Sequence, residues 1–135
     1  MVKKFSYKTR IYYEDTDLGG VVYYANYLRY FERARTEYLR DIGYGQKKLM
    51  QEGSIFIVRH VNIDFLRPAT LDDNIVIKTK LIKLGRVSFD FSQDVYSHSE
   101  ETLCKAIIQC GCLDIEKFKP TSLPPYLLKG MKSLM

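Results

Sequence analysis

The sequence predicts an α+β fold in which an antiparallel sheet of about five strands wraps around one long helix. Apolar residues of the segment 23–42 recur every three or four positions, as on the buried face of a helix. Several later segments instead alternate apolar and polar residues, which indicates strands. Short connections between these strands favour antiparallel pairing, and only the helix is long enough to cover the sheet.

The elements follow one another in a simple order. A first strand is expected over residues 5–13, where Phe5, Tyr7, Ile11 and Tyr13 stand at odd positions. The loop YEDTDLGGVVYY leads into the helix, which we expect to end at Gly43 because a left-handed residue is often needed there. The remaining elements are a helical turn or two over 46–52, strands over 61–65, 75–81, 87–95 and 102–115, a hairpin turn at 84–86, and a short helix or frayed end after 120.

Composition limits the classes of function. The length suits a single domain, residues 1–135, and the net charge of +5 fits a phosphorylated ligand or a generic basic surface. Basic residues of the helix are interleaved with acidic ones, so we expect no nucleic-acid partner. The apolar runs are shorter than the roughly 20 residues of a membrane span, and the N-terminus lacks the apolar core of a signal peptide. We therefore expect a cytoplasmic protein without integral membrane contact.

Most catalytic and metal-binding arrangements fit this sequence poorly. Only two histidines occur, His60 and His98, and there is no G-x-S-x-G motif, which argues against a serine triad. The three cysteines, Cys104, Cys110 and Cys112, have neither disulfide nor zinc-site spacing, so we expect reduced thiols, no metal and no cofactor.

The carboxylates Asp15 and Asp17 remain as candidates for chemistry. They precede a diglycine and then the helix, whose start offers unpaired N–H groups and a positive dipole end. Such N–H groups can polarise a carbonyl, and a nearby carboxylate can attack it or activate a water. The glycines would let the backbone pass close to a bound acyl group. Spacing alone leaves a second interpretation open, in which both acids only shape the loop through side-chain to backbone bonds.

Residues 12–39, YYEDTDLGGVVYYANYLRYFERARTEYL, resemble the signature of the YbgC-type acyl-CoA thioesterases. These enzymes belong to the 4-hydroxybenzoyl-CoA thioesterase branch of the hotdog fold. The matching positions are Tyr13, Asp15, Asp17, Gly20, Val22, Tyr23, Asn26, Tyr27, Glu32 and Arg35. A weaker likeness continues through FIVRHVNIDFLRPATLDD. The resemblance implies a hotdog fold, a curved antiparallel sheet around one helix, in an oligomer that is a dimer or a tetramer.

The resemblance also assigns roles to residues. It places catalysis on Asp17, as nucleophile or as general base for water, and the polarising N–H on Tyr24. Many YbgC-type members carry histidine at the position of Tyr24, and tyrosine is a poor general base at neutral pH. The backbone role therefore carries over, and participation of the Tyr24 side chain stays open. Substrate contacts are expected from Tyr13, Gly20, Val22, Tyr23, Arg59 and Arg86, the two arginines for the nucleotide and pyrophosphate.

The function expected from the sequence is hydrolysis of an acyl-CoA or acyl carrier protein thioester. A non-catalytic acyl-CoA-binding hotdog module is the alternative. A hotdog dehydratase is disfavoured because that chemistry usually needs a histidine, and neither His60 nor His98 is near the helix start in sequence. Asp17 separates the enzyme from the binder, since a binder has no use for an unpaired acid at the acyl carbonyl.

Overall fold

The computed structural model describes residues 5–135 as an antiparallel sheet with three α-helices. The strands are β1 (Phe5–Arg10), β2 (Ser54–Phe65), β3 (Asn74–Leu84), β4 (Ser88–Ser97) and β5 (Thr102–Asp114). The helices are α1 (Asn26–Asp41), α2 (Gln46–Gln51) and α3 (Pro125–Lys132), preceded by a 3₁₀ turn, η1 (Tyr13–Asp15). The predicted α+β architecture is confirmed.

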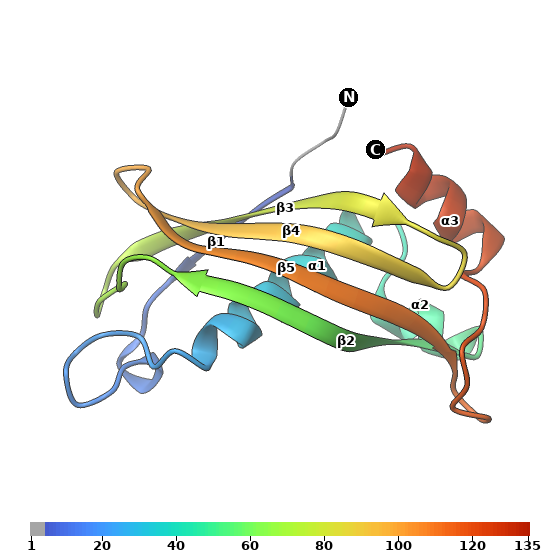
Figure 1. Ribbon diagram of the computed structural model, residues 1–135, viewed down its shortest axis with the longest axis horizontal. Coiled ribbons are helices and arrows are strands. Elements are labelled where there is room, and N and C mark those ends of the chain that lie inside the picture. Colours follow the sequence, from blue (N-terminus) through green and yellow to red (C-terminus); the bar gives the residue numbers. More distant parts are fainter. Residues whose placement is uncertain (1–4) are drawn as a thin grey trace.

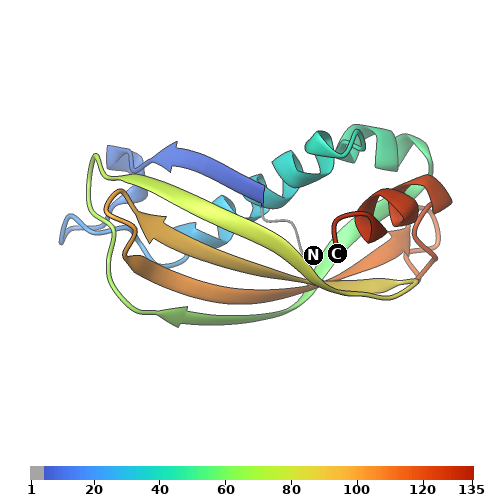
Figure 2. The same cartoon turned by 90° about the horizontal axis from the view of Figure 1, so that it is seen from above.

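The five strands form one sheet in the order β1-β3-β4-β5-β2, and every neighbouring pair is antiparallel. In Figure 1, α1 runs behind the curved sheet, and the loop that leads into α1 projects at one end. The helices α2 and α3 and the turn between β3 and β4 lie at the opposite end (Figures 1 and 2). This arrangement is the hotdog architecture that the resemblance implies.

The core lies between α1 and the inner face of the sheet. Alternation on the strands decides its composition, because every second side chain points toward the helix. From α1 it receives Tyr27, Tyr30, Phe31, Ala34, Tyr38 and Leu39; from β3 and β4 it receives Ile75, Ile77, Leu81, Phe89, Phe91 and Val95. Leu127 and Met131 of α3 are buried in the same cluster, so the C-terminal segment forms a helix that packs on the core.

A buried polar network ties α1 to the sheet. Arg35 donates from Nη1 to Oε1 of Gln93 at 2.9 Å. The amide nitrogen of Gln93 donates to the carbonyl of Phe31 at 3.0 Å and to Oγ1 of Thr79 at 2.9 Å. Gln93 and Thr79 are fully buried, and Arg35, which also pairs with Glu32, is 7% exposed. Each side chain is satisfied only if α1 lies in one place over β3 and β4, so the network fixes the position of the helix.

Two boundaries differ from the sequence prediction because of turns. The first strand ends at Arg10 rather than residue 13, since Asp15 N–H donates to the Tyr12 carbonyl at 2.9 Å and closes η1. The helix begins at Asn26 rather than residue 23. Its first N–H groups, those of Asn26, Tyr27 and Leu28, donate to carbonyls three residues earlier, which makes the entry a tighter turn.

The strand predicted over residues 61–65 is longer than expected and begins at Ser54. A β-bulge explains the difference. The pairing with β5 shifts register between Val58 and His60, which leaves Arg59 as the extra residue. Before the bulge the inward side chains are at even positions, such as Phe56 and Val58. After it they are at odd positions, such as Val61. His60, which precedes the strand predicted over residues 61–65, therefore lies within β2.

Candidate active site

The segment from Asp15 to Tyr23 folds into a small hairpin of its own. Asp17 N–H donates to the Val21 carbonyl at 2.9 Å, and Tyr23 N–H donates to the Asp15 carbonyl at 3.0 Å. Gly20 N–H closes the tip by donating to the Asp17 carbonyl at 3.0 Å. Val22 N–H reaches the Ala69 carbonyl at 2.9 Å and so attaches the hairpin to the segment after β2. The loop that the sequence singled out is thus hydrogen-bonded structure rather than a flexible connection.

The conformation of the hairpin tip explains the two glycines, Gly19 and Gly20. Gly20 adopts φ +77°, the left-handed region that glycine enters at no steric cost. This conformation, following a turn closed by the same residue, is the G1-bulge form of a three-residue hairpin. A Cβ at Gly19 would lie 3.3 Å from Oδ1 of Asp17 and would crowd that carboxylate. Both glycines therefore shape the turn that presents Asp17.

Asp15 and Asp17 make different bonds. Oδ2 of Asp15 accepts the Tyr12 N–H at 2.9 Å, and the Asp15 carbonyl accepts the side-chain amide of Asn26 at 2.9 Å. Asp15 thereby joins η1 to the first residue of α1. Oδ1 of Asp17 accepts the Gly19 N–H at 2.9 Å, whereas within residues 5–135 its Oδ2 has no hydrogen-bond partner and the side chain is exposed. Both acids therefore make side-chain to backbone bonds that shape the loop, and Asp17 keeps one oxygen free.

Tyr24 lies between the hairpin and the helix, two residues before the first residue of α1. In the described part of the chain, its N–H and that of Ala25 have no acceptor, because the turn that opens α1 uses the N–H groups from Asn26 onward. The free donors at this end of the helix are therefore those of Tyr24 and Ala25. The ring of Tyr24 is 63% exposed and contacts Phe65 edge-on, with the centroids 6.0 Å apart.

A shallow hollow of about 240 Å³ lies beside Tyr24. Its lining is mostly apolar and consists of Val22, Tyr24, Tyr27, Phe65, Leu66, Arg67 and Pro68. The hollow thus joins the start of α1 to the end of β2, about forty residues later in the chain. Of the residues predicted to bind substrate or act on it, it brings together Val22 and Tyr24.

Below the hairpin, the hydroxyl of Tyr30 is buried without a hydrogen-bond partner. Tyr30 lies one helical turn after Asn26, whose side chain holds Asp15. Burial raises the pKa of Tyr30 well above its usual range, and the nearby Asp15 carboxylate raises this pKa further. Tyr30 therefore remains a neutral phenol at all working pH values.

The other predicted contacts are spread over the chain. Tyr13 lies in η1 and is 82% exposed, and Tyr23 is half exposed beside Tyr24, with ring centroids 5.2 Å apart. The stem of Arg59 lies over Gly111, whose neighbours Cys110 and Cys112 point inward, so Arg59 lies on the outer face of the sheet.

Arg86 lies in the turn between β3 and β4, where it donates to Oγ of Ser122 at 3.3 Å. This turn and the Asp17 hairpin lie at opposite ends of the molecule (Figure 1). Within one chain the fold brings neither Arg59 nor Arg86 to Asp17.

Among residues 5–135, no cluster of three or more His, Cys, Asp or Glu side chains has the arrangement of a metal site. Within the same range no helix has the length and apolar character needed to cross a membrane.

Comparison with known proteins shows the family of this chain. The family model described as the Thioesterase-like superfamily matches residues 12–131. The chain belongs to this superfamily. The prediction of a thioester hydrolase is thereby confirmed at the level of the family, and the predicted resemblance to the YbgC type is confirmed by the following relatives.

The acyl-CoA thioesterase YbgC of Haemophilus influenzae is 41% identical over 121 residues, which cover 89% of this chain and 88% of that protein. The acyl-CoA thioester hydrolase YbgC of Escherichia coli is 39% identical over 128 residues, covering 95% of this chain and 96% of that protein. A solved structure of a probable thioesterase from Bartonella henselae superposes with a TM-score of 0.86 at 39% identity, covering 90% of this chain and all of that chain. This superfamily member therefore shares sequence and fold with thioesterases over most of its length.

Sequence reasoning missed part of the hollow. Phe65 and Leu66 were not proposed as site residues, although the inward alternation of β2 ends at Phe65. The signal that could have found them is the segment FLRP, because the chain leaves the sheet there and must pass the helix start to place Ala69 in the core.

Proposed function

We propose that this chain hydrolyses acyl thioesters of coenzyme A or of an acyl carrier protein. Asp17 acts as nucleophile or general base, and the N–H of Tyr24 polarises the thioester carbonyl. The proposal is supported by two features of the segment that leads into α1: Asp17 in the hairpin has one free carboxylate oxygen, and the N–H of Tyr24 before the helix has no acceptor within residues 5–135. The named relatives, which are acyl-CoA thioesterases, supply the substrate class.

The bond from Gly19 to Asp17 orients the carboxylate for this task. It uses Oδ1, so Oδ2 is available to attack the acyl carbon or to accept a proton from water. In the nucleophilic route, Oδ2 forms a mixed anhydride with the acyl group, the thiolate leaves and takes a proton, and water then releases the acid. In the general-base route, water attacks directly. Both routes give free acid and thiol.

The N–H of Tyr24 supplies the other half of the chemistry. As the acyl carbon becomes tetrahedral, its oxygen gains negative charge, which a fixed N–H stabilises most strongly where water is excluded. The positive end of the α1 dipole adds to this effect. The apolar wall of Val22, Tyr27 and Phe65 would cover the acyl group and keep water away.

We propose that more than one chain contacts the substrate. Arg59 lies on the outer face and Arg86 at the far end, so a nucleotide held by either arginine would need a thioester site on another subunit. Such a role is consistent with the edge strand β2, whose inward side chains Val58 and Phe65 are 44% and 50% exposed. We propose that β2 lies at a dimer interface, and that dimers can associate further into a tetramer.

Tyr13, Tyr23 and Gly20 keep the substrate-binding roles proposed from the resemblance. Tyr13 and Tyr23 present exposed rings next to the hairpin, where they can contact an acyl or pantetheine chain. Gly20 adopts the left-handed conformation with which its N–H closes the turn before Val21. The proposal takes residues 1–135 as one hotdog thioesterase domain.

A non-catalytic acyl-CoA-binding module is the second candidate, because the loop-shaping bonds of Asp15 and Asp17 would be needed there too. Asn at position 17 separates the two functions. The Asp17→Asn variant keeps an oxygen that can accept the Gly19 N–H, so its turn should survive. It loses a carboxylate able to attack or to take a proton.

The experiment is acyl-CoA hydrolysis by Asp17→Asn over a series of acyl chain lengths that includes aromatic acyl groups. We expect loss of hydrolysis with unchanged circular dichroism and oligomeric state. Glu14→Gln, which removes an exposed acid from the same segment, is the matched control and should retain activity. Hydrolysis by Asp17→Asn at the rate of Glu14→Gln would refute the catalytic role and favour the binding module.

A further inference from the structure

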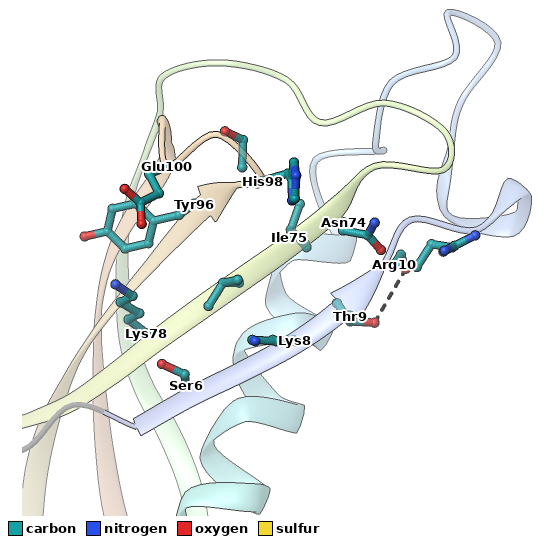
Figure 3. Close-up of a pocket in the computed structure, with 12 residues that line it drawn as sticks. Ser6, Lys8, Thr9, Arg10, Asn74, Ile75, Lys78, Tyr96, His98 and Glu100 are labelled. Carbon is teal, nitrogen blue, oxygen red and sulfur yellow. Dashed lines mark hydrogen bonds between the residues drawn. The ribbon is translucent and has the colours of Figure 1, made fainter.

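A second and larger hollow, of about 860 Å³, lies on the outer face of the sheet, over β1, β3 and the end of β4. Figure 3 shows its lining side chains, which include Lys8, Arg10, Asn74, Lys78, Tyr96 and Glu100. The volume is within the range of roughly 300–1,000 Å³ that small-molecule sites occupy. This hollow and the one beside Tyr24 lie on opposite faces of the sheet, so the thioester site does not account for it.

Three basic side chains gather in the hollow. Lys8 and Arg10 are alternate residues of β1 and point to the same face, opposite the uncharged Val76 and Asn74 of β3. Lys78 lies on the next strand, opposite Asp94, with its Nζ 5.1 Å from the ring centroid of Tyr96. Within residues 5–135 none of the three cations forms an ion pair. Like charges this close on one face are unfavourable, and an anion at Lys8 and Arg10 would relieve their repulsion.

One carboxylate at the rim of the hollow is held at a conformational cost. Glu100 has φ +66° in the turn between β4 and β5, where Ser97 N–H donates to the Glu101 carbonyl and Glu100 N–H to the Ser97 carbonyl. The Asp17 hairpin has the same two bonds, with Gly20 at the corresponding position. A glutamate adopts a positive φ only at a cost in conformational energy that glycine does not have. Such backbone strain is often retained at functional positions.

The hollow therefore has basic side chains, Lys8 and Arg10, toward one end and the carboxylate of Glu100 at the other. Figure 3 shows Glu100 beside the ring of Tyr96, at the end of the hollow away from Arg10, with His98 between them and Lys8 along the floor. A phosphate group suits the Lys8 and Arg10 end, where charge-assisted bonds form. A carboxylate such as Glu100 accepts hydrogen bonds from ribose hydroxyls, and a tyrosine ring offers a face for a base.

We propose that this outer hollow binds a nucleoside phosphate, with the phosphate at Lys8 and Arg10 and the sugar hydroxyls at Glu100. The ligand can be a free nucleotide or the nucleotide end of a coenzyme A molecule, because both present the same phosphate, ribose and base. The site is separate from Asp17 and does not depend on the proposed hydrolysis.

The test is calorimetric titration of the full chain with ADP. We expect saturable binding with a dissociation constant below about 1 mM, weakened at least about tenfold in the Lys8→Ala/Arg10→Ala variant. Lys105→Ala removes a lysine from the same outer face outside the hollow and should leave ADP binding unchanged. The absence of ADP binding, or equal weakening by Lys105→Ala, would overturn the proposal.

A second variant separates the two ends of the hollow. Glu100→Gln should weaken the binding of ADP and leave that of pyrophosphate unchanged, because pyrophosphate has no sugar. Equal effects on both ligands would contradict the assignment of Glu100. Since Glu100 lies in an exposed turn, this variant keeps the test valid even if the β1 double variant unfolds.

Steady-state kinetics identify the source of the nucleotide. An unchanged KM for acyl-CoA in Lys8→Ala/Arg10→Ala indicates a free nucleotide, and a raised KM indicates the nucleotide end of the substrate. Failure of the hydrolysis proposal would instead appear as an active Asp17→Asn enzyme. The two proposals therefore fail in distinguishable ways.

Discussion

The N–H of Gly19 donates to Oδ1 of Asp17 at 2.9 Å, so the carboxylate is oriented by the loop that carries it. This bond is formed by residues two apart and needs no other part of the fold. The position of the hairpin relative to α1 depends on other contacts, those of Asp15 with Asn26 and of Val22 with Ala69. The proposed catalytic geometry combines a locally determined turn with two anchors to residues distant in sequence.

Two substitutions at Tyr24 can separate backbone from side chain. Tyr24→Phe keeps the N–H and should retain most of the hydrolytic activity. Tyr24→Pro removes the N–H, and because that group has no acceptor in residues 5–135, it breaks no hydrogen bond of the fold. We expect its kcat to fall about 100-fold or more, as when an oxyanion donor is lost.

The measurement is kcat and KM on one acyl-CoA for both variants, with thermal melting as the control for folding. A comparable loss in Tyr24→Phe would show that the phenol participates. Full activity of a folded Tyr24→Pro enzyme would exclude the backbone role.

The two matching turns predict opposite stability changes. Gly20→Ala places a Cβ at φ +77° and should lower the free energy of unfolding by about 1 kcal/mol. Glu100→Gly removes the same kind of strain and should raise it, by up to about 1 kcal/mol after the entropic cost of glycine. Urea denaturation of both variants checks the signs. A loss of stability in Glu100→Gly would mean that its side chain stabilises the turn more than its backbone strains it.

Gln93 should be among the most sensitive positions of the core. Gln93→Leu has similar volume but leaves Arg35 without its buried acceptor and the Phe31 carbonyl without its donor. We expect a loss of about 3 kcal/mol in the free energy of unfolding. Ser92→Ala, on the outer face of the same strand, should stay within about 0.5 kcal/mol of the parent. Equal urea midpoints for the two variants would show that the network adds nothing to stability.

The thiols give a prediction about pH. Burial raises the pKa of Cys104 to about 12 and that of Cys110 to about 11, and it also raises the pKa of Cys112. The native protein therefore holds neutral thiols at pH 8. A thiol reagent should detect none of them until denaturant is added, after which all three should react. Free coenzyme A can consequently be measured with such a reagent without background from the native protein.

The raised thiol pKa values also predict how the stability of the protein changes with pH. Unfolded thiols ionise near pH 8.5, below their pKa values in the native state. The unfolded state therefore loses protons first, and stability falls as pH rises from about 9 toward 11. Denaturant midpoints measured at pH 8 and pH 10 should differ in that direction. A Cys110→Ala variant should show a smaller difference.

The sheet and the long helix could be predicted because their periodicity repeats over many residues, as in β4 with its alternation from Phe89 to Val95. The first half of β2 could not. The run Ile55 to Val58 is apolar throughout, and the bulge at Arg59 breaks the alternation that defines the second half. A period of two cannot be recognised across a point where the inward face changes parity.

The candidate site divides in a similar way. Asp17, Gly20 and Tyr24 are close in sequence, so the motif was visible as one stretch. Phe65 and the Arg67 beside it reach the hollow through the tertiary fold, and no local pattern marks them. Arg59 and Arg86 were proposed from the resemblance, which cannot show that one lies on the outer face and the other at the far end.

The strand order has a consequence for how the chain acquires its structure. β1 pairs only with β3, and β2 only with β5, so each edge strand must wait for a partner made much later. The β3–β4–β5 meander can form first because its strands are consecutive, and α1 can then dock on it. Folding should be slow for a chain of this size, since many contacts join distant residues. If synthesis stopped before β5 was made, β2 would have no neighbouring strand. Its apolar face and its unpaired backbone groups would then be exposed to aggregation.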